Sequence, residues 1–417
     1  MQSHILTHIR QLVNVRPEAS PLYGPDMAEL PCINEAWLLI EDGEIAAYGK
    51  MDSIKEELPA LPAHSTDCSG GLVMPAWCDS HSHIVFAGSR ENEMVDKIRG
   101  LSYAEINARG GGILHTVQQI SDISEEELFR VSMKRLDEVS ALGTGAIEIK
   151  SGYGLSPQLE LKMLRVIRRL KETSPMQIKS TFLGAHTYPL AYRENHEMYI
   201  RQITDEMIPV IAKEKLADYI DVFCEKGFFN PEETERILRA GMSFGLEPKM
   251  HVNQLHSIGG IEKGIQLNAV SMDHLETMPA EEIARIKKSD WKGFCTLLPT
   301  AAFFLRMGFP PARQLLDAGC ALTLASDYNP GSSPAGNMNL VIALACIQMK
   351  MLPEEALNAA TLNGAFAMGL GKTLGSITKG KRANLIITKP VPSLAYLPYS
   401  FGSSLIDKVI LSGQFIG

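Results

Sequence analysis

The chain alternates between short apolar segments and longer amphipathic ones from about residue 72 to residue 372. The short segments are apolar at both odd and even positions, which is typical of strands buried on both faces of a parallel sheet. Eight such strands are predicted, at 72–79, 144–150, 177–185, 219–225, 247–252, 269–274, 293–298 and 321–327.

The amphipathic segments repeat apolar residues every three to four positions, and this period predicts helices. Several of them begin with proline, which the first turn of a helix tolerates. The clearest lie at 125–141, 157–171, 231–244, 279–288 and 353–368. Eight strand and helix units in about 300 residues predict an α/β fold of the (β/α)8 TIM barrel type. A doubly wound open sheet is the alternative.

Both ends of the chain have a different pattern, in which short apolar runs are separated by turn residues. Asp42 and Gly43 stand between the runs 36–40 and 45–49, which is a hairpin signal. Similar runs lie at 383–387 and 408–413. We therefore predict a small β-sandwich domain built from residues 1–71 and 373–417, beside a barrel domain of residues 72–372.

A long segment, 84–143, separates the first two predicted strands and contains the run RGGG at 109–112. The glycines neither follow a strand as G-x-G-x-x-G nor precede a P-loop lysine, so a phosphate site is disfavoured. We expect a flexible loop over the mouth of the barrel.

Composition narrows the class of protein. With 417 residues, 45% hydrophobic and 21% charged, the chain can bury a sizeable core. A net charge of -8 disfavours a nucleic-acid binder and favours a small-molecule substrate. The seven cysteines include no C-x-x-C pair, and no apolar run reaches the roughly 20 residues of a membrane span. No signal peptide is recognised either, so a cytoplasmic protein without membrane attachment is expected.

The candidate chemistry gathers where the predicted strands end, which is where barrel enzymes place their active sites. Five of the eleven histidines stand there: His81, His83, His186, His251 and His274. His81 and His83 are two apart in an extended segment, so both imidazoles face one side and can approach one ion. His251 from the fifth strand and Asp327 from the eighth reach the same end, and three nitrogens with one carboxylate suit Zn2+ or Fe2+.

Two further questions concern the ends of the fourth and sixth strands. His274 follows Asp273 at the sixth strand end, a position that favours a functional role over that of a buried structural histidine. Cys224 ends the fourth strand and is interpreted as a small apolar residue. A binuclear centre bridged by a modified lysine is disfavoured, with Lys226 as the one nearby lysine that keeps it open.

Several segments resemble the imidazolonepropionase family of the amidohydrolase superfamily. They are MPAWCDSHSH at 74–83, EIKSGYG at 148–154, TFLGAH at 181–186, SDYNPGSS at 326–333 and GKRANL at 380–385. The resemblance spans roughly residues 70–390, and the combined motifs are far more specific than H-x-H alone.

This resemblance implies a hydrolase that opens the ring amide of 4-imidazolone-5-propanoate to give N-formimidoyl-L-glutamate, using one divalent metal ion, Zn2+ or Fe2+/Fe3+. It implies His81, His83, His251 and Asp327 as metal ligands. Asp327 is the expected proton acceptor, and His274 is expected to stabilise the developing oxyanion, alone or together with the metal. The substrate-binding positions that carry over are Arg90, Tyr103, Tyr153, His186, Gln254, Asn329, Gly331 and Ser332.

Some of these assignments also make physical sense. The planar guanidinium of Arg90 suits the carboxylate of a propanoate tail. Gly331 and Ser332 offer backbone and hydroxyl donors to a carboxylate, whereas Asn329 is equally suited to a turn before Pro330. A homodimer is predicted only because two-fold dimers are the commonest oligomers.

The chain departs from the family at a few positions. Ala76, Ser80 and Ser82 replace the usual glycine, proline and threonine, and Asn253 stands where aspartate is common. Gln254 occupies a position where glutamate also appears, and an amide cannot shuttle a proton.

Two other functions are weighed against the hydrolase. Nucleobase or adenosine deaminases of the same superfamily carry an acid three residues after the histidine that corresponds to His251, and Gln254 argues against them. A non-catalytic barrel of the superfamily would have lost its metal ligands, but all four are present here.

Overall fold

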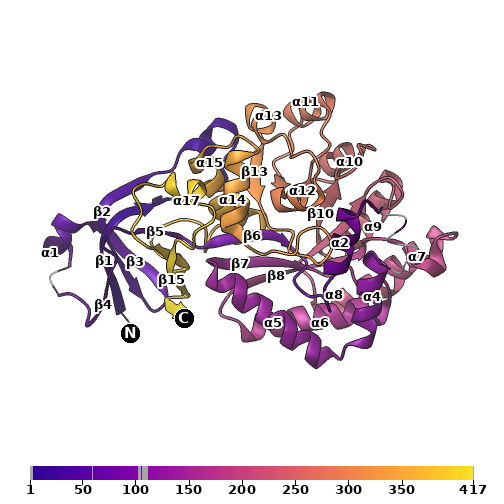
Figure 1. Cartoon of the computed structure of the whole chain (residues 1–417), viewed down its shortest axis with the longest axis horizontal. Helices are drawn as coiled ribbons and strands as arrows, with labels where there is room; N and C mark the ends of the chain where they lie inside the picture. The colour runs from indigo at the N-terminus through magenta and orange to yellow at the C-terminus, as the bar shows by residue number, and fades with distance from the viewer. Residues whose placement is uncertain (1–2, 59, 102–104, 106–110, 417) are drawn as a thin grey trace.

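Two eight-stranded sheets organise the computed structural model, which describes residues 3–416 except 59, 102–104 and 106–110 (Figure 1). The first sheet is parallel and runs in chain order from β6 to β13. Its strands are β6 (Trp77–Ser82), β7 (Thr144–Lys150), β8 (Gln177–Ala185), β9 (Tyr219–Cys224), β10 (Glu247–Val252), β11 (Ser271–His274), β12 (Phe294–Leu297) and β13 (Ala321–Leu324).

The first and last strands of this sheet meet, so the sheet closes. Asp327 N donates to His81 O at 2.9 Å, and His83 N donates to Tyr328 O at 2.9 Å. The predicted (β/α)8 barrel is therefore confirmed, and the open doubly wound sheet is excluded.

Helices follow the barrel strands, and capping residues explain where several of them begin. Ser124 accepts a hydrogen bond from Glu127 N, and Asn230 forms a capping box with Glu233. The larger helices are α2 (Glu91–Ile98), α4 (Ile113–Asp122), α5 (Glu125–Ala141), α6 (Pro157–Thr173), α9 (Pro231–Ser243), α11 (Ala280–Lys288) and α14 (Met338–Ile347). Shorter ones are α7 (His196–Arg201), α8 (Ile208–Glu214), α10 (Gly260–Gln266), α12 (Pro299–Leu305), α13 (Ala312–Asp317), α15 (Pro353–Asn358), α16 (Gly364–Ala367) and α17 (Tyr396–Tyr399).

The helices predicted at 125–141, 157–171, 231–244 and 279–288 are found within two residues of their expected ends. The helix predicted at 353–368 is divided, because a π-helical turn, η5 (Ala359–Asn363), lies between α15 and α16. The segment predicted as a mouth loop contains α2 and α4, while Arg109 and Gly110 lie outside the described residues.

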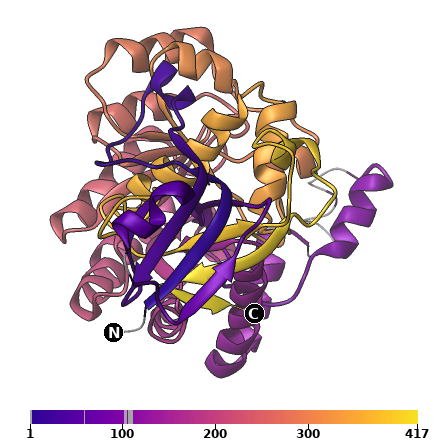
Figure 2. The same cartoon turned by 90° about the vertical axis from the view of Figure 1, so that its left-hand side faces the viewer.

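Strands from both chain ends build the second sheet, which Figure 2 shows from the side where the termini lie. Its strands are β1 (Ser3–Val13), β2 (Cys32–Glu41), β3 (Glu44–Lys50), β4 (His64–Asp67), β5 (Leu72–Pro75), β14 (Leu385–Thr388), β15 (Ile406–Leu411) and β16 (Gln414–Ile416). β2 and β3 form the predicted hairpin around Asp42 and Gly43. The side chains on one face of β1, β2, β14 and β15 pack into a single apolar core, as in a sandwich, so the predicted small β domain is confirmed.

The first predicted strand, 72–79, is wrong as one element. The chain pairs with β14 as β5, leaves that sheet at Ala76, and enters the barrel as β6. Alternate residues of β5 serve different cores, with Val73 in the core of the small domain and Met74 in that of the barrel. Because the residues on both sides of this change, 72–75 and 77–78, form one uninterrupted apolar run, the hydrophobic pattern could not show the change of sheet. The domain boundaries at 71/72 and 372/373 stay predictions.

No helix in the described part of the chain is both long and apolar enough to cross a membrane.

Candidate active site

A cavity of about 840 Å³ lies at the carboxyl ends of the barrel strands. The predicted site residues that line it are His83, Arg90, Tyr153, His186, His251, Gln254, His274, Asp327, Asn329, Gly331 and Ser332. His81 is buried next to His83 and His251. Tyr103 lies outside the described residues. The structure thus brings together residues that the sequence spreads over some 250 positions.

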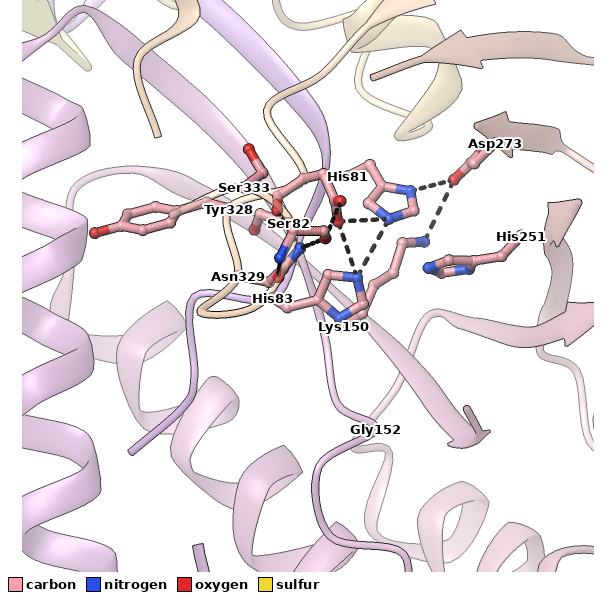
Figure 3. A network of polar contacts seen from close by, with 12 residues as sticks. His81, Ser82, His83, Lys150, Gly152, His251, Asp273, Tyr328, Asn329 and Ser333 are labelled. Carbon is pink, nitrogen blue, oxygen red and sulfur yellow. Dashed lines mark hydrogen bonds and ion pairs between the residues drawn. The ribbon is translucent and has the colours of Figure 1, made fainter. Parts of the chain in front are cut away.

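The four predicted metal ligands lie close to one another, and Figure 3 labels the three histidines among them. The Nε2 atoms of His81 and His83 are 3.3 Å apart, and Asp327 Oδ1 lies 3.5 Å from each of them. The ring of His251 is 4.5 Å from that of His81 and 5.5 Å from that of His83, measured between centroids. The strand ends therefore aim three imidazoles and one carboxylate at the same place.

The chemistry of these groups fits a divalent cation. Burial and neighbouring positive charges hold the pKa of His81 and of His83 well below the usual value, so both rings are neutral and can offer lone pairs. His251 Nε2 is buried and has no hydrogen-bond partner among the described residues. Such an unpaired buried nitrogen is costly, and a bound cation would satisfy it. Three imidazole nitrogens with one carboxylate are a donor set of zinc and iron.

The ring nitrogens of His274, His81 and His251 that could bind a metal lie within 4.8 Å of one another, so His274 could also share the ion. Its Nδ1 is 3.3 Å from Glu276 Oε1. Burial lowers the pKa of His274, but the charge and the hydrogen bond of Glu276 outweigh burial and raise that pKa to about 9. A protonated imidazole has only donors and cannot bind a cation, so His274 is better suited to contact an oxyanion. The backbone φ of His274 is 85°, in the left-handed region that residues other than glycine rarely adopt. Such strained backbone conformations are often found at functional sites.

Beneath the imidazoles lies a layer of charged side chains that sequence reasoning missed. Asp273 Oδ2 is 2.6 Å from His81 Nδ1. Asp221 Oδ2 is 3.0 Å from His251 Nδ1, an ion-pair distance at an angle outside ideal hydrogen-bond geometry. Two signals were available in the sequence: Glu148 and Lys150 are charged at i and i+2 within a buried strand, and Lys249 stands two positions before His251.

A tight loop after β7 carries one predicted substrate contact, Tyr153, and is bonded by a second, His186. The buried carboxylate of Glu160 accepts hydrogen bonds from the backbone N–H groups of Gly152, Gly154 and Leu155, at 3.1, 2.7 and 3.0 Å. His186 Nδ1 in turn donates to Gly152 O at 3.1 Å, and its ring lies 5.5 Å from that of Tyr153. Glu160 was not predicted as a site residue, because its role depends on this loop folding back onto α6.

The loop after β13 is held by Asn329. Its Oδ1 accepts from Gly331 N and Ser332 N, each at 2.8 Å, and its Nδ2 donates to Asp327 O at 2.7 Å. The backbone N–H groups of Gly331 and Ser332 are thus used within the turn, and Asn329, which also lines the cavity, holds that turn. The roles of Asn329, Gly331 and Ser332 in substrate binding stay predictions. Ser332 Oγ donates to Asp327 Oδ2 at 3.1 Å.

Arg90 reaches the cavity next to Gly331, and its guanidinium is fixed by Glu93. The two side chains form a bidentate pair, with Nε–Oε1 at 2.9 Å and Nη2–Oε2 at 2.7 Å. Glu93 also accepts from Gly112 N at 2.8 Å, which ties α2 to the start of α4. A Cβ atom at position 331 would lie 2.4 Å from Arg90 Nη1, so only glycine allows this approach.

Lys226, the lysine that kept a binuclear centre open, is exposed and is not among the residues that line the cavity.

Comparison with known proteins places these features in a family. Residues 226–416 match the model of the amidohydrolase family. The chain is 55% identical to the imidazolonepropionase of Flavobacterium johnsoniae over 414 residues, covering 99% of each chain. It is 40% identical to the imidazolonepropionase of Geobacillus kaustophilus over 419 residues, covering 100% of this chain and 98% of the other.

Solved structures with a similar fold are more distant in sequence. E. coli guanine deaminase superposes with a TM-score of 0.74 at 15% identity, covering 100% of this chain and 99% of the other. An adenosine deaminase from Xanthomonas campestris with bound zinc gives a TM-score of 0.72 at 16% identity, covering 99% and 92%. At this identity the likeness establishes the barrel fold and no more.

Proposed function

Because this chain belongs to the imidazolonepropionase family of the amidohydrolase superfamily, we propose that it hydrolyses the ring amide of 4-imidazolone-5-propanoate to N-formimidoyl-L-glutamate in histidine degradation. The observation that carries the proposal is that the imidazoles of His81, His83 and His251 gather with one carboxylate beside a cavity of about 840 Å³. The protein is a metal-dependent hydrolase. Gln254 in the cavity wall disfavours a deaminase, which needs an acid at that place.

We propose that His81, His83, His251 and Asp327 hold one Zn2+ or Fe2+/Fe3+ ion. When bound, such a cation supplies Lewis acidity, which makes a water molecule nucleophilic at neutral pH. The neutral rings of His81 and His83 and the unpaired Nε2 of His251 support this assignment.

The remaining steps fall to side chains around the cavity. Asp327 accepts a proton from the attacking water, and the hydrogen bond from Ser332 Oγ to Asp327 Oδ2 leaves Oδ1 toward the imidazoles. His274, held by Glu276, stabilises the negative charge that develops on the ring carbonyl oxygen. Asp327 then returns its proton to the departing ring nitrogen, which completes the ring opening without an acid at position 254.

Substrate binding is assigned to the cavity wall. The Arg90 fork, fixed by Glu93, is the partner for the propanoate carboxylate. Tyr153 and His186 flank the ring, and Gln254 supplies an amide contact. Tyr103 keeps its predicted role from the family resemblance. A cytoplasmic location and a homodimer stay predictions.

The function is tested by supplying 4-imidazolone-5-propanoate made freshly from urocanate. We expect its ultraviolet absorbance to disappear at a rate proportional to enzyme concentration, with N-formimidoyl-L-glutamate identified by mass. Guanine and adenosine serve as comparison substrates. Turnover of either of them, with the imidazolone left intact, would replace this proposal by a deaminase.

Replacing Arg90 by alanine is expected to raise KM for the substrate by about 10- to 100-fold, since a charge-assisted hydrogen-bonded pair contributes about 1.5–3 kcal/mol. kcat should change by less than about threefold, because Arg90 contacts a part of the substrate whose charge does not change in the reaction. Steady-state kinetics measure both constants. Arg90→Lys is the control. It keeps the positive charge but not the planar pair of N–H donors, so its KM should lie between that of the parent protein and that of Arg90→Ala. A variant with unchanged KM and a low kcat would contradict the assignment of Arg90.

A further inference from the structure

Five charged side chains fill the barrel below the imidazoles, where apolar residues usually pack. They are Glu148 and Lys150 from β7, Asp221 from β9, Lys249 from β10 and Asp273 from β11, all fully buried. Buried charges are costly unless they are paired. A layer of five buried charges therefore calls for a specific role that offsets this cost. Three carboxylates face two ammonium groups, which leaves one formal negative charge directly below the predicted cation site.

Lys150 is the centre of this layer. Its Nζ lies 2.6 Å from Glu148 Oε1, 2.8 Å from Asp221 Oδ2 and 3.6 Å from Asp273 Oδ2. The two aspartate oxygens that face Lys150 are the same atoms that face His251 Nδ1 at 3.0 Å and His81 Nδ1 at 2.6 Å. Figure 3 shows the chain of contacts from His81 through Asp273 to Lys150.

We propose that Lys150 is a positioning residue that fixes the His81 and His251 imidazoles together, through Asp273 and Asp221. A carboxylate at Nδ1 makes Nε2 the lone-pair atom and sets the direction of the ring. Without the ammonium between them, the two aspartates would repel each other and their side chains would separate. Lys150 thereby sets the distance between two rings that come from opposite parts of the barrel wall. This inference rests on the proposed function, in which both rings bind the metal.

Lys249 provides the matched comparison. Its ammonium bonds the other oxygen of Glu148 and lies 4.6 Å from the centre of the Tyr219 ring. In the described structure its hydrogen bonds and ion pairs include neither Asp221 nor Asp273. Replacing either lysine by methionine removes one fully buried ammonium and one partner of Glu148, but only Lys150→Met breaks the link to the imidazoles.

The test measures metal affinity directly in the purified full-length chain. Zn2+ is titrated against a chelator of known affinity, and the absorption bands of the Co2+-loaded protein report ligand geometry. We expect Lys150→Met to raise the zinc dissociation constant by about 10- to 100-fold and to shift the cobalt bands, which is typical of losing an outer partner of a metal ligand. Lys249→Met should stay within about threefold of the parent protein, with the parent cobalt spectrum.

Asp221→Asn and Asp273→Asn provide a second route if Lys150→Met does not fold. Each removes the same link from the carboxylate side, keeps the side-chain shape, and should also weaken zinc binding and shift the cobalt bands. Equal zinc affinities in Lys150→Met and Lys249→Met, or unchanged affinity in both asparagine variants, would overturn the role of Lys150. A parent protein that binds no zinc or cobalt would instead overturn the metal site of the proposed function.

Discussion

Replacing Asp327 by alanine is expected to lower kcat/KM by at least about 10³-fold and to leave the protein without stoichiometric metal. The loss combines two effects, because the same carboxylate is the proposed ligand and the proposed proton acceptor, and a positioned acid–base group alone contributes about 10²- to 10⁴-fold. Steady-state kinetics and elemental analysis of the purified variant measure both effects. The fold should survive, since the side chain points into the cavity and its backbone N–H still bonds His81 O.

Asp327→Asn separates the two roles. The amide keeps the size of the side chain and one oxygen ligand, but it cannot accept a proton. We expect this variant to retain part of the metal and still lose at least about 10²-fold in kcat. A metal-free Asp327→Ala protein with full activity would refute both roles at once, whereas an active Asp327→Asn protein would refute only the proton transfer.

The fold and the convergence of the site were predictable because both follow short-range rules. His81 and His83 share a side of one strand, and each strand of a parallel barrel delivers its last residues to the same end. It was therefore enough to recognise the strands to expect His251 and Asp327 beside that pair, and the structure places all four together. The exact limits of the first strand mattered little, since its carboxyl end was identified even though 72–79 divides into two strands.

What could not be predicted depends on contacts between strands that are distant in sequence. In the sequence, Lys150 stands out only as a charged residue within a buried strand, and its partners are known only when β9 and β11 bring Asp221 and Asp273 to its ammonium. Likewise, the sequence allows Asn329 as a substrate contact or as a turn residue, and its part in the turn depends on two backbone N–H groups that bond its side chain. Glu160 supports Tyr153 only because the loop after β7 folds onto α6, and this contact cannot be recognised in the sequence.

Removing the metal is expected to abolish activity reversibly while the barrel stays folded. Chelation followed by desalting should reduce kcat by at least about 10³-fold, because none of the described side chains that line the cavity supplies the Lewis acidity of a cation. The apo-protein should melt at a lower temperature than the loaded protein, since a ligand that binds only the folded state adds stability in proportion to the logarithm of its concentration. It should keep its circular dichroism, because the apolar cores of the barrel and of the β domain do not include the imidazoles.

Reloading with Zn2+ or, under anaerobic conditions, with Fe2+ tests which ion restores turnover. Mg2+ is the control, because it prefers oxygen ligands and should restore no turnover. Full activity in the apo-protein would contradict the metal-dependent mechanism, and rescue by Mg2+ would contradict the assignment of three imidazole ligands.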